Sequence, residues 1–251
     1  MRVTADYHTH TVYSHGRGSI EENVKAALKR GLKAVGISDH GPGHLFIGVR
    51  GGGALRRMRE EIRTLRRKYL QIDILFGVEA NIVDLDGKID VPEKMLPTLD
   101  YLLLGYHKLV RPRSVRAFFW LAANLFCGWL KLRPAWLRRL NTAAICAAVR
   151  RYPVAAVTHP GLQVDIDTAE LAAVCGERGT LLEINSSYGE KLDGYVRTAL
   201  PLGVSFLCSS DAHTPERVGD FAAAFALIRR LKVPVERVVN LQADDREKQE
   251  E

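Results

Sequence analysis

Seven short apolar runs alternate along the chain with longer segments of helical period. Several runs are almost wholly apolar, as β-strands are when helices cover both faces of their sheet. The runs are Val3–Tyr7, Ala34–Ser38, Ile72–Val78, Tyr101–Gly105, Val154–Thr158, Leu181–Asn185 and Val204–Ser209. Strands that are each followed by a helix pair in parallel, and seven of them predict an α/β fold with a closed or nearly closed barrel. An open doubly wound sheet is the alternative.

The segments between these runs are expected to form helices. They are Glu21–Arg30, Ala54–Tyr69, Asn141–Arg151, Thr168–Arg178, Lys191–Leu200 and Pro215–Leu231. Asp167 and Thr214 are suitable N-cap residues, and Pro215 suits a first helical turn. Because 47% of the 251 residues are hydrophobic, the chain can fill one large domain. We expect this domain over residues 1–235 and a polar C-terminal tail over residues 236–251.

The cysteine spacing and the N-terminus indicate the cellular compartment, and the net charge indicates the kind of partner. The four cysteines lie far apart without a C-x-x-C pair, which argues against a structural zinc site and a disulfide scaffold. The first ten residues, MRVTADYHTH, lack the apolar segment of a signal peptide. Both features predict a cytoplasmic protein. The net charge of +7 favours anionic partners such as phosphates, nucleic acid or an acidic membrane surface.

The histidines gather at one end of the predicted strands. Seven of the eight, all except His44, lie at or beyond a strand's carboxyl end, and two carboxylates share this placement. The nine residues are His8, His10, His15, His40, Glu79, His107, His159, Asp211 and His213. A single histidine beside a strand is usually a surface or hydrogen-bonded residue. However, the carboxyl ends of parallel strands share one face, and nine donors there are costly to leave unpaired. The pattern therefore predicts a metal centre.

The kinds of donor indicate which metals and how many. Residues two apart in a strand project from the same side, so His8 and His10 can bind one ion, and Asp211 and His213 repeat that spacing. Nitrogen and oxygen donors together suit zinc, manganese or iron. Nine ligands exceed the needs of one ion, so we expect two or three divalent ions, with Glu79 able to bridge a pair.

Seven stretches of this sequence resemble a known family. They read DYHTHTVYSHG, GISDHGPGH, FGVEANI, LLGYHK, VTHPG, LEINSSY and SSDAHTPERVG and span residues 6–219. They resemble the PHP (polymerase and histidinol phosphatase) superfamily, and within it the single-domain bacterial phosphatases of the YcdX type. The resemblance implies a distorted (β/α)7 barrel with a trinuclear metal site at the C-terminal ends of the strands. It assigns one ion to His8, His10, Glu79 and Asp211, a second to Glu79, His107 and His159, and a third to His15, His40 and His213.

The activity that the resemblance implies is hydrolysis of a small phosphomonoester. Ions about 3.5–4 Å apart can share a water and lower its pKa, which supplies a metal-bridging hydroxide as the nucleophile. A metal-dependent nuclease is the first alternative, because related domains accompany DNA polymerases and the charge is positive. A non-enzymatic membrane-associated or regulatory module is the second alternative, which the complete ligand set disfavours.

Four further residues are candidates beside the metal motifs. Asp39 is placed to orient His40, with a plain turn residue as an equal alternative. Arg17, Lys108 and Arg217 are candidates for binding the substrate phosphate. In a chain with 36 Lys and Arg residues, a solvated charge is the ordinary alternative for each.

Residues 111–139 depart from the family pattern as an apolar and basic insertion, RPRSVRAFFWLAANLFCGWLKLRPAWLRR. The apolar part, Ala117–Leu130, is shorter than the roughly 20 residues of a transmembrane helix. We expect a helical hairpin broken at Pro134 that packs over the barrel or against a second subunit. Contact with a membrane surface is the alternative. Because the insertion follows His107, it is expected to overhang the site and set substrate size.

Overall fold

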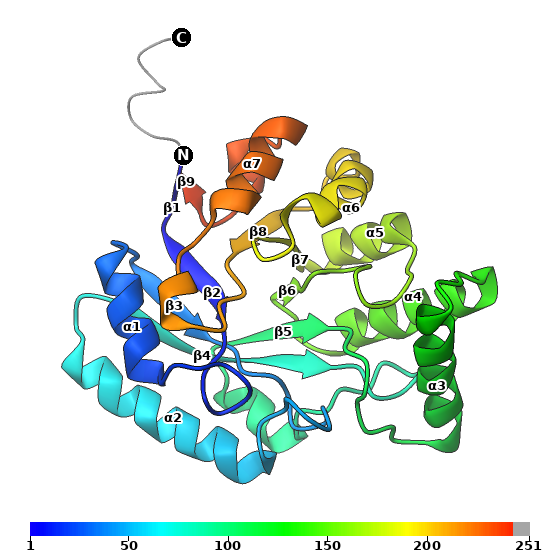
Figure 1. The fold of residues 1–251 in the computed structure, drawn as a ribbon, viewed down its shortest axis with the longest axis horizontal. Coiled ribbons are helices and arrows are strands. Elements are labelled where there is room, and N and C mark those ends of the chain that lie inside the picture. Colours follow the sequence, from blue (N-terminus) through cyan, green and yellow to red (C-terminus); the bar gives the residue numbers. More distant parts are fainter. Residues whose placement is uncertain (243–251) are drawn as a thin grey trace.

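A parallel seven-stranded sheet forms the centre of the computed structural model, which describes residues 1–242 (Figure 1). Its strand order is β2-β3-β4-β5-β6-β7-β8, so each crossover leads to the neighbouring strand. The strands are β2 (Ala5–Thr9), β3 (Ala34–Ile37), β4 (Asp73–Asn81), β5 (Tyr101–Gly105), β6 (Ala156–Val157), β7 (Leu181–Asn185) and β8 (Phe206–Ser209). The predicted count of seven parallel strands is confirmed.

The two outer strands of the sheet meet and nearly close it into a barrel. The backbone N–H of His10 donates to the carbonyl of Ala212 over 2.8 Å, and the N–H of Ala212 donates to the carbonyl of His8 over 3.2 Å. Leu103, Ala156 and Leu207 form a separate buried cluster in the sheet. The open doubly wound alternative is therefore wrong, because the segment after β8 bonds to the end of β2.

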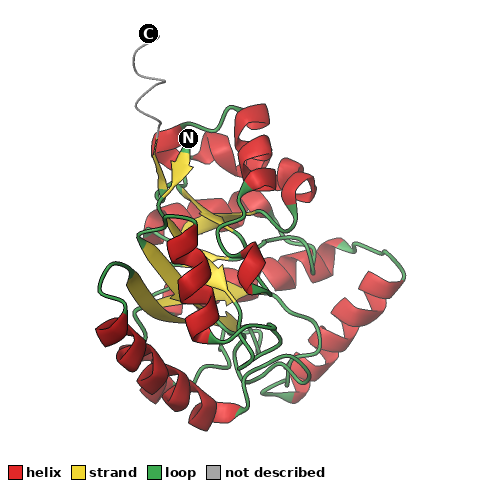
Figure 2. Ribbon diagram, turned by 60° about the vertical axis from the view of Figure 1, so that its left-hand side comes forward, coloured by secondary structure: helices red, strands yellow, loops and turns green. Residues whose placement is uncertain are grey.

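Helices surround the sheet in both views (Figures 1 and 2). The α-helices are α1 (Ile20–Lys29), α2 (Gly51–Lys68), α3 (Val115–Trp129), α4 (Ala135–Arg151), α5 (Thr168–Arg178), α6 (Asp193–Ala199) and α7 (Ala222–Leu231). Short 3-10 helices are η1 (Glu93–Thr98), η2 (Gly189–Leu192), η3 (Leu200–Leu202), η4 (Pro215–Arg217) and η5 (Val235–Arg237). Asp167 caps α5 as predicted. The helix predicted from Pro215 is interrupted near Gly219, whose φ is 75°.

Two strands differ from their predicted bounds in ways that matter for the site. β2 begins and ends two residues later than expected, so His8 lies inside the strand and His10 follows it directly. β4 extends three residues beyond its expected end, so Glu79 lies within the strand rather than at its end. The apolar pattern did not reveal these extensions because most of the added residues, such as His8 and Glu79, are polar.

The C-terminal part of the described chain packs on the N-terminal part. β1 (Arg2–Val3) pairs antiparallel with β9 (Leu241–Gln242). Asn240 Nδ2 donates to the carbonyls of Ala5 and Cys208, over 2.8 and 2.7 Å. The folded body thus extends past residue 235 to Gln242, and the rest of the expected tail, 243–251, lies outside the described residues.

The insertion forms a helical hairpin with its break at Pro134, as predicted. Ser114 caps α3 through a hydrogen bond to the N–H of Ala117, and α4 begins six residues earlier than expected, directly after Pro134. We call residues 115–151 the α3–α4 hairpin. Within residues 1–242, none of the helices is both long enough and apolar enough to cross a membrane.

A buried amide holds the two helices of the hairpin together. Asn141 Oδ1 accepts from Trp120 Nε1 over 2.7 Å and from Asn124 Nδ2 over 2.9 Å. Asn141 Nδ2 donates to Asn124 Oδ1 and to the carbonyl of Asp165, both over 2.9 Å. Asn141 therefore ties α3, α4 and the loop before α5 into one unit.

We expect Asn141→Ala to lower the free energy of unfolding by about 2–4 kcal/mol, because each buried polar group left unpaired costs about 1–3 kcal/mol. Urea denaturation followed by circular dichroism measures the change. Arg139→Ala, on the exposed side of the same helix, is the matched control and should shift stability by less than about 0.5 kcal/mol. Equal stability of the two variants would contradict an anchoring role for Asn141.

Candidate metal centre

The carboxylate of Glu79 lies at the centre of a ring of histidines. Its Oε2 is 2.8 Å from His40 Nδ1 and 3.4 Å from His8 Nε2. Its Oε1 is 3.0 Å from His159 Nε2 and 3.5 Å from His107 Nε2. All five side chains are buried. The two oxygens thus face different histidines, which is the geometry of a carboxylate able to bridge two ions.

Asp211 provides a second acidic group beside the histidines of β2. Its Oδ1 is 3.2 Å from His10 Nε2 and 3.5 Å from His8 Nε2, and these two ring nitrogens are 3.1 Å apart. His213 Nδ1 lies 3.6 Å from the same oxygen. His15 is exposed at the rim, with its ring centroid 4.2 Å from that of His213. The structure therefore brings all nine predicted donors into one cluster.

The cluster contains three groups of three residues, and within each group the ligand atoms all lie within 4.8 Å of one another. They are His8, His10 and Asp211; His10, His40 and His213; and His40, Glu79 and His107. The first group corresponds to the first implied ion. The second group resembles the third implied ion, but it contains His10 in place of His15. The third group resembles the second implied ion, but it contains His40 in place of His159.

Several donor atoms of the cluster are buried without a hydrogen-bond partner among the described residues. They are His10 Nδ1, His40 Nδ1 and Glu79 Oε2, the last two of which lie 2.8 Å apart without the geometry of a hydrogen bond. A buried polar atom without a partner costs free energy, and a bound cation would satisfy such an acceptor. The donor set therefore fits divalent metal ions.

Burial and charge set the protonation of these side chains. Burial lowers the pKa of His10 and of His107 well below the usual value, so both rings keep a free lone pair. Burial would raise the pKa of Glu79, but the histidines around it, His107 first, hold that pKa well below its usual range. Burial would lower the pKa of His8, yet nearby carboxylates raise it well above the usual value. His10, His107 and Glu79 are thus held in the unprotonated forms that bind a metal ion.

The backbone is irregular where it presents three of the donors. The pairing of β2 with β3 shifts register between Asp6 and Thr9, where the strand presents His8. His159 and Asp211 have positive φ angles, 27° and 53°, which non-glycine residues rarely adopt. At the end of β5, a Cβ on Gly105 would lie 2.7 Å from His107 Cε1 and 2.9 Å from Glu79 Oε1. Close approach of the backbone to the cluster therefore requires glycine there.

Two buried residues that the sequence reasoning missed hold the histidine rings. Glu183 Oε1 is 2.6 Å from His8 Nδ1, and its Oε2 accepts from the backbone N–H of His159 over 2.7 Å. Asn81 Oδ1 is 2.8 Å from His107 Nδ1. Each contact directs the other ring nitrogen toward the centre. A carboxylate inside the otherwise apolar run LLEIN was the available sequence signal for Glu183.

Asp39 contacts the loop after β2. Its carboxylate accepts from the N–H of Thr11 over 2.8 Å, from Thr11 Oγ1 over 2.6 Å, and from Ser14 Oγ. Among the described residues it makes no hydrogen bond to the ring of His40. The expected orientation of His40 by Asp39 is therefore corrected: Asp39 fixes the loop that leads to His15.

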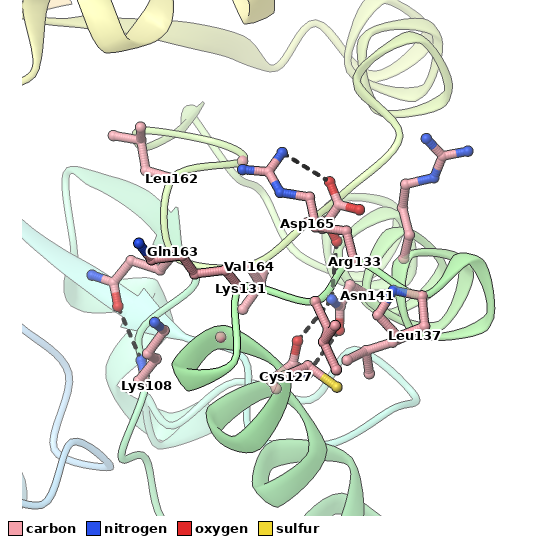
Figure 3. Close-up of a pocket in the computed structure, with 16 residues that line it drawn as sticks. Lys108, Cys127, Lys131, Arg133, Leu137, Asn141, Leu162, Gln163, Val164 and Asp165 are labelled. Atoms are coloured by element: carbon pink, nitrogen blue, oxygen red, sulfur yellow. Dashed lines mark hydrogen bonds and ion pairs between the residues drawn. The ribbon is translucent and has the colours of Figure 1, made fainter.

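The three candidate phosphate-binding residues differ in their surroundings. The exposed Arg17 donates its backbone N–H to the carbonyl of His213 over 2.8 Å. Arg217 pairs with Asp220 over 3.1 Å, so its charge is already balanced. Lys108 is half-buried and lines a cavity of about 260 Å³ between the α3–α4 hairpin and the loop 161–165 (Figure 3). Lys131 and Arg138 line the same cavity.

The parallel barrel with buried histidines and carboxylates at the carboxyl ends of its strands defines a metal-binding β/α barrel protein. The chain belongs to the PHP domain family, whose model matches residues 6–187.

Curated relatives match over nearly the whole chain. One named "Probable phosphatase", from Caldanaerobacter subterraneus subsp. tengcongensis, is 30% identical over 97% of this chain and 89% of its own length. Another of that name, from Acetivibrio thermocellus, is 27% identical over 96% of this chain and 92% of its own length. Histidinol phosphate phosphatase from Lactococcus lactis, solved with zinc, L-histidinol and phosphate, superposes with a TM-score of 0.61. It covers 93% of this chain and 95% of its own at 14% identity, which shows a shared fold.

We expect Glu183→Gln to weaken metal binding by about 10–100-fold, because partners of this kind typically contribute that much to a metal site. The amide nitrogen cannot accept the hydrogen bonds that the carboxylate accepts from His8 and His159. Metal titration followed by calorimetry measures the affinity. Glu177→Gln, on the exposed part of α5, is the matched control, and equal affinities for the two variants would contradict this role.

Proposed function

We propose that the protein is a metal-dependent phosphatase, a hydrolase of phosphoric monoesters, which acts on a small phosphorylated substrate at a centre of three divalent ions. The observation that carries the proposal is the convergence of nine donors from the region of six strands, with Glu79 at their centre. The names of the curated relatives support the reaction, and the solved relative with zinc supports the metal. Zinc, manganese and iron all suit the donor set.

The proposed ligand sets follow the family apportionment. His8, His10 and Asp211 would hold one ion, supported by the short separations among their donor atoms. His107 and His159 would hold the second, supported by the approach of both rings to Glu79 Oε1, with Glu79 shared between the two ions. The third would be held by His15, His40 and His213, whose rings stack or contact edge to face at the rim.

Bound ions of this kind would supply a hydroxide nucleophile near neutral pH and neutralise charge on the phosphoryl oxygens. Other residues of the chain orient the ligands of the metal centre. Glu183 and Asn81 hold His8 and His107 by their Nδ1 atoms, so each Nε2 faces inward. Asp39 keeps the loop carrying His15 against the end of β2. No side-chain nucleophile is needed for this reaction.

The organic part of the substrate would lie toward the cavity beside Lys108. Lys108 follows the ligand His107 directly, and Gly161 in the opposite wall lies two residues after His159. The α3–α4 hairpin forms another wall, so its position limits the size of the substrate. Lys108 donates its backbone N–H to Gln163 Oε1 over 3.1 Å. Its ammonium group forms no ion pair or hydrogen bond among residues 1–242, so it is available to a phosphate or another anionic group.

We expect His10→Ala to lower kcat/KM for phosphomonoesters at least about a hundredfold and to reduce bound metal, because His10 belongs to two of the three ligand groups. The measurement pairs elemental analysis with a panel of phosphomonoesters and labelled oligonucleotides, assayed with manganese and with zinc. His44→Ala, which alters the one histidine outside the proposed ligand set, should keep its metal content.

Several results would count against the phosphatase. Cleavage of the oligonucleotides without hydrolysis of any monoester would establish the nuclease instead. Unchanged activity after removal of all metal by a chelator would exclude metal dependence. A His10→Ala protein that fails to fold would indicate a metal required for structure, and circular dichroism separates that case from loss of catalysis.

We expect Lys108→Ala to raise KM for the best phosphomonoester about tenfold while kcat changes less, because a cation that contacts substrate in the ground and transition states contributes mainly to binding. Steady-state kinetics measure both constants. Lys29→Ala, at the exposed end of α1, is the matched control. A fall in kcat at constant KM would place Lys108 in the chemical step rather than in substrate binding.

A further inference from the structure

Helix α3 is apolar on two opposite faces. One face is buried against the barrel and α4 and consists of Ala117, Trp120, Asn124 and Cys127. The opposite face is exposed along its length and consists of Val115, Phe118, Phe119, Leu125, Phe126 and Trp129. Phe119 is 66% exposed and Trp129 is 78% exposed, whereas Trp120 is 3% exposed. We call these six exposed residues the outer face of α3.

The outer face lies at the edge of the molecule. In Figure 1, α3 forms the right-hand border, and the barrel lies on its other side. A helix of 15 residues is about 22 Å long, so the outer face offers a continuous apolar strip to a partner. Apolar strips of this size on a soluble protein mark binding surfaces.

The chain segment that contains the outer face carries only basic charges. From Tyr101 to Val164 the chain contains ten Lys or Arg residues and no Asp or Glu. Arg116, Lys131 and Arg139 are exposed and form no ion pair among the described residues. Two acids from other segments reach this region: Asp84 accepts from Ser114 Oγ, and Asp165 lies 3.8 Å from Arg133. The partner of this surface must therefore be apolar at its centre and anionic around it.

We propose that the outer face of α3 binds an anionic lipid bilayer surface, with its aromatic side chains among the headgroups and the flanking Arg and Lys residues on the phosphates. Aromatic and aliphatic side chains bounded by cations are the features of helices that lie in a membrane interface. The proposal concerns a surface distinct from the metal centre and holds whether or not the phosphatase activity is found.

A second copy of the chain suits this surface less well. A two-fold interface brings the same patch of both subunits together, so each apolar strip would carry the other's cations into its rim. Without acidic residues between 101 and 164, those like charges would repel. An anionic bilayer satisfies the apolar strip and the charges together.

Vesicle flotation of the full chain tests the proposal. The protein should float with vesicles of phosphatidylcholine and phosphatidylglycerol, and at least tenfold less with vesicles of phosphatidylcholine alone or in high salt, because charge and apolar contact act together. The double variant F119S/F126S should bind anionic vesicles at least tenfold more weakly. The matched control is Leu70→Ser, which removes an isolated side chain, 85% exposed, at the end of α2.

A fluorescence measurement serves if F119S/F126S folds poorly. The tryptophan emission should shift to shorter wavelength on addition of anionic vesicles, and the shift should shrink in W129F, which leaves the buried Trp120 and the exposed Trp136 in place. Binding to both vesicle types alike, or equal binding by the wild type and F119S/F126S, would overturn the proposal. So would a concentration-dependent dimer in sedimentation that F119S/F126S abolishes without vesicle binding, which would assign the outer face to a second copy. Absence of vesicle binding by a monomer would overturn it in favour of a protein partner.

Discussion

The buried carboxylate of Glu79 is the constraint on which the rest of the structure depends. A carboxylate enclosed in a barrel requires positive charge or hydrogen-bond donors around it. Four histidines approach its two oxygens, and Thr158 Oγ1 donates to Oε1 over 2.7 Å. Parallel strands make this convergence possible because their carboxyl ends share one rim. The parallel barrel therefore also brings together the residues of the metal centre.

The residues around the donors fix the geometry of the metal centre. Glu183 and Asn81 fix two ring orientations, Asp39 fixes a loop, and Gly105 leaves room for the backbone to approach. The positive φ angles of His159 and Asp211 are conformations that only the surrounding contacts can maintain. Such preorganisation is what a centre for phosphoryl transfer requires, since its chemistry consists largely of positioning and charge neutralisation.

The α3–α4 hairpin links the site to the exterior of the molecule. Its inner side and Lys108 line the same cavity. Asn141 connects the two helices of the hairpin to the loop before α5. Its outer side presents aromatic residues to the solvent within a basic region. The proposals on substrate size and on membrane binding thus both rest on this one insertion.

The sequence by itself determined the seven strands, their parallel order and the identity of the nine donors, because apolar periodicity and donor spacing are local properties of the chain. The bounds of β5 and β7 were predicted to the residue, whereas β2 and β4 extend further toward the site. Only the tertiary structure decided that Glu183 and Asn81 hold the rings and that Asp39 bonds to Thr11 instead of His40. It also decided which face of α3 is left exposed. Those contacts join segments far apart in the chain, and no local pattern specifies which distant partner a buried polar group will meet.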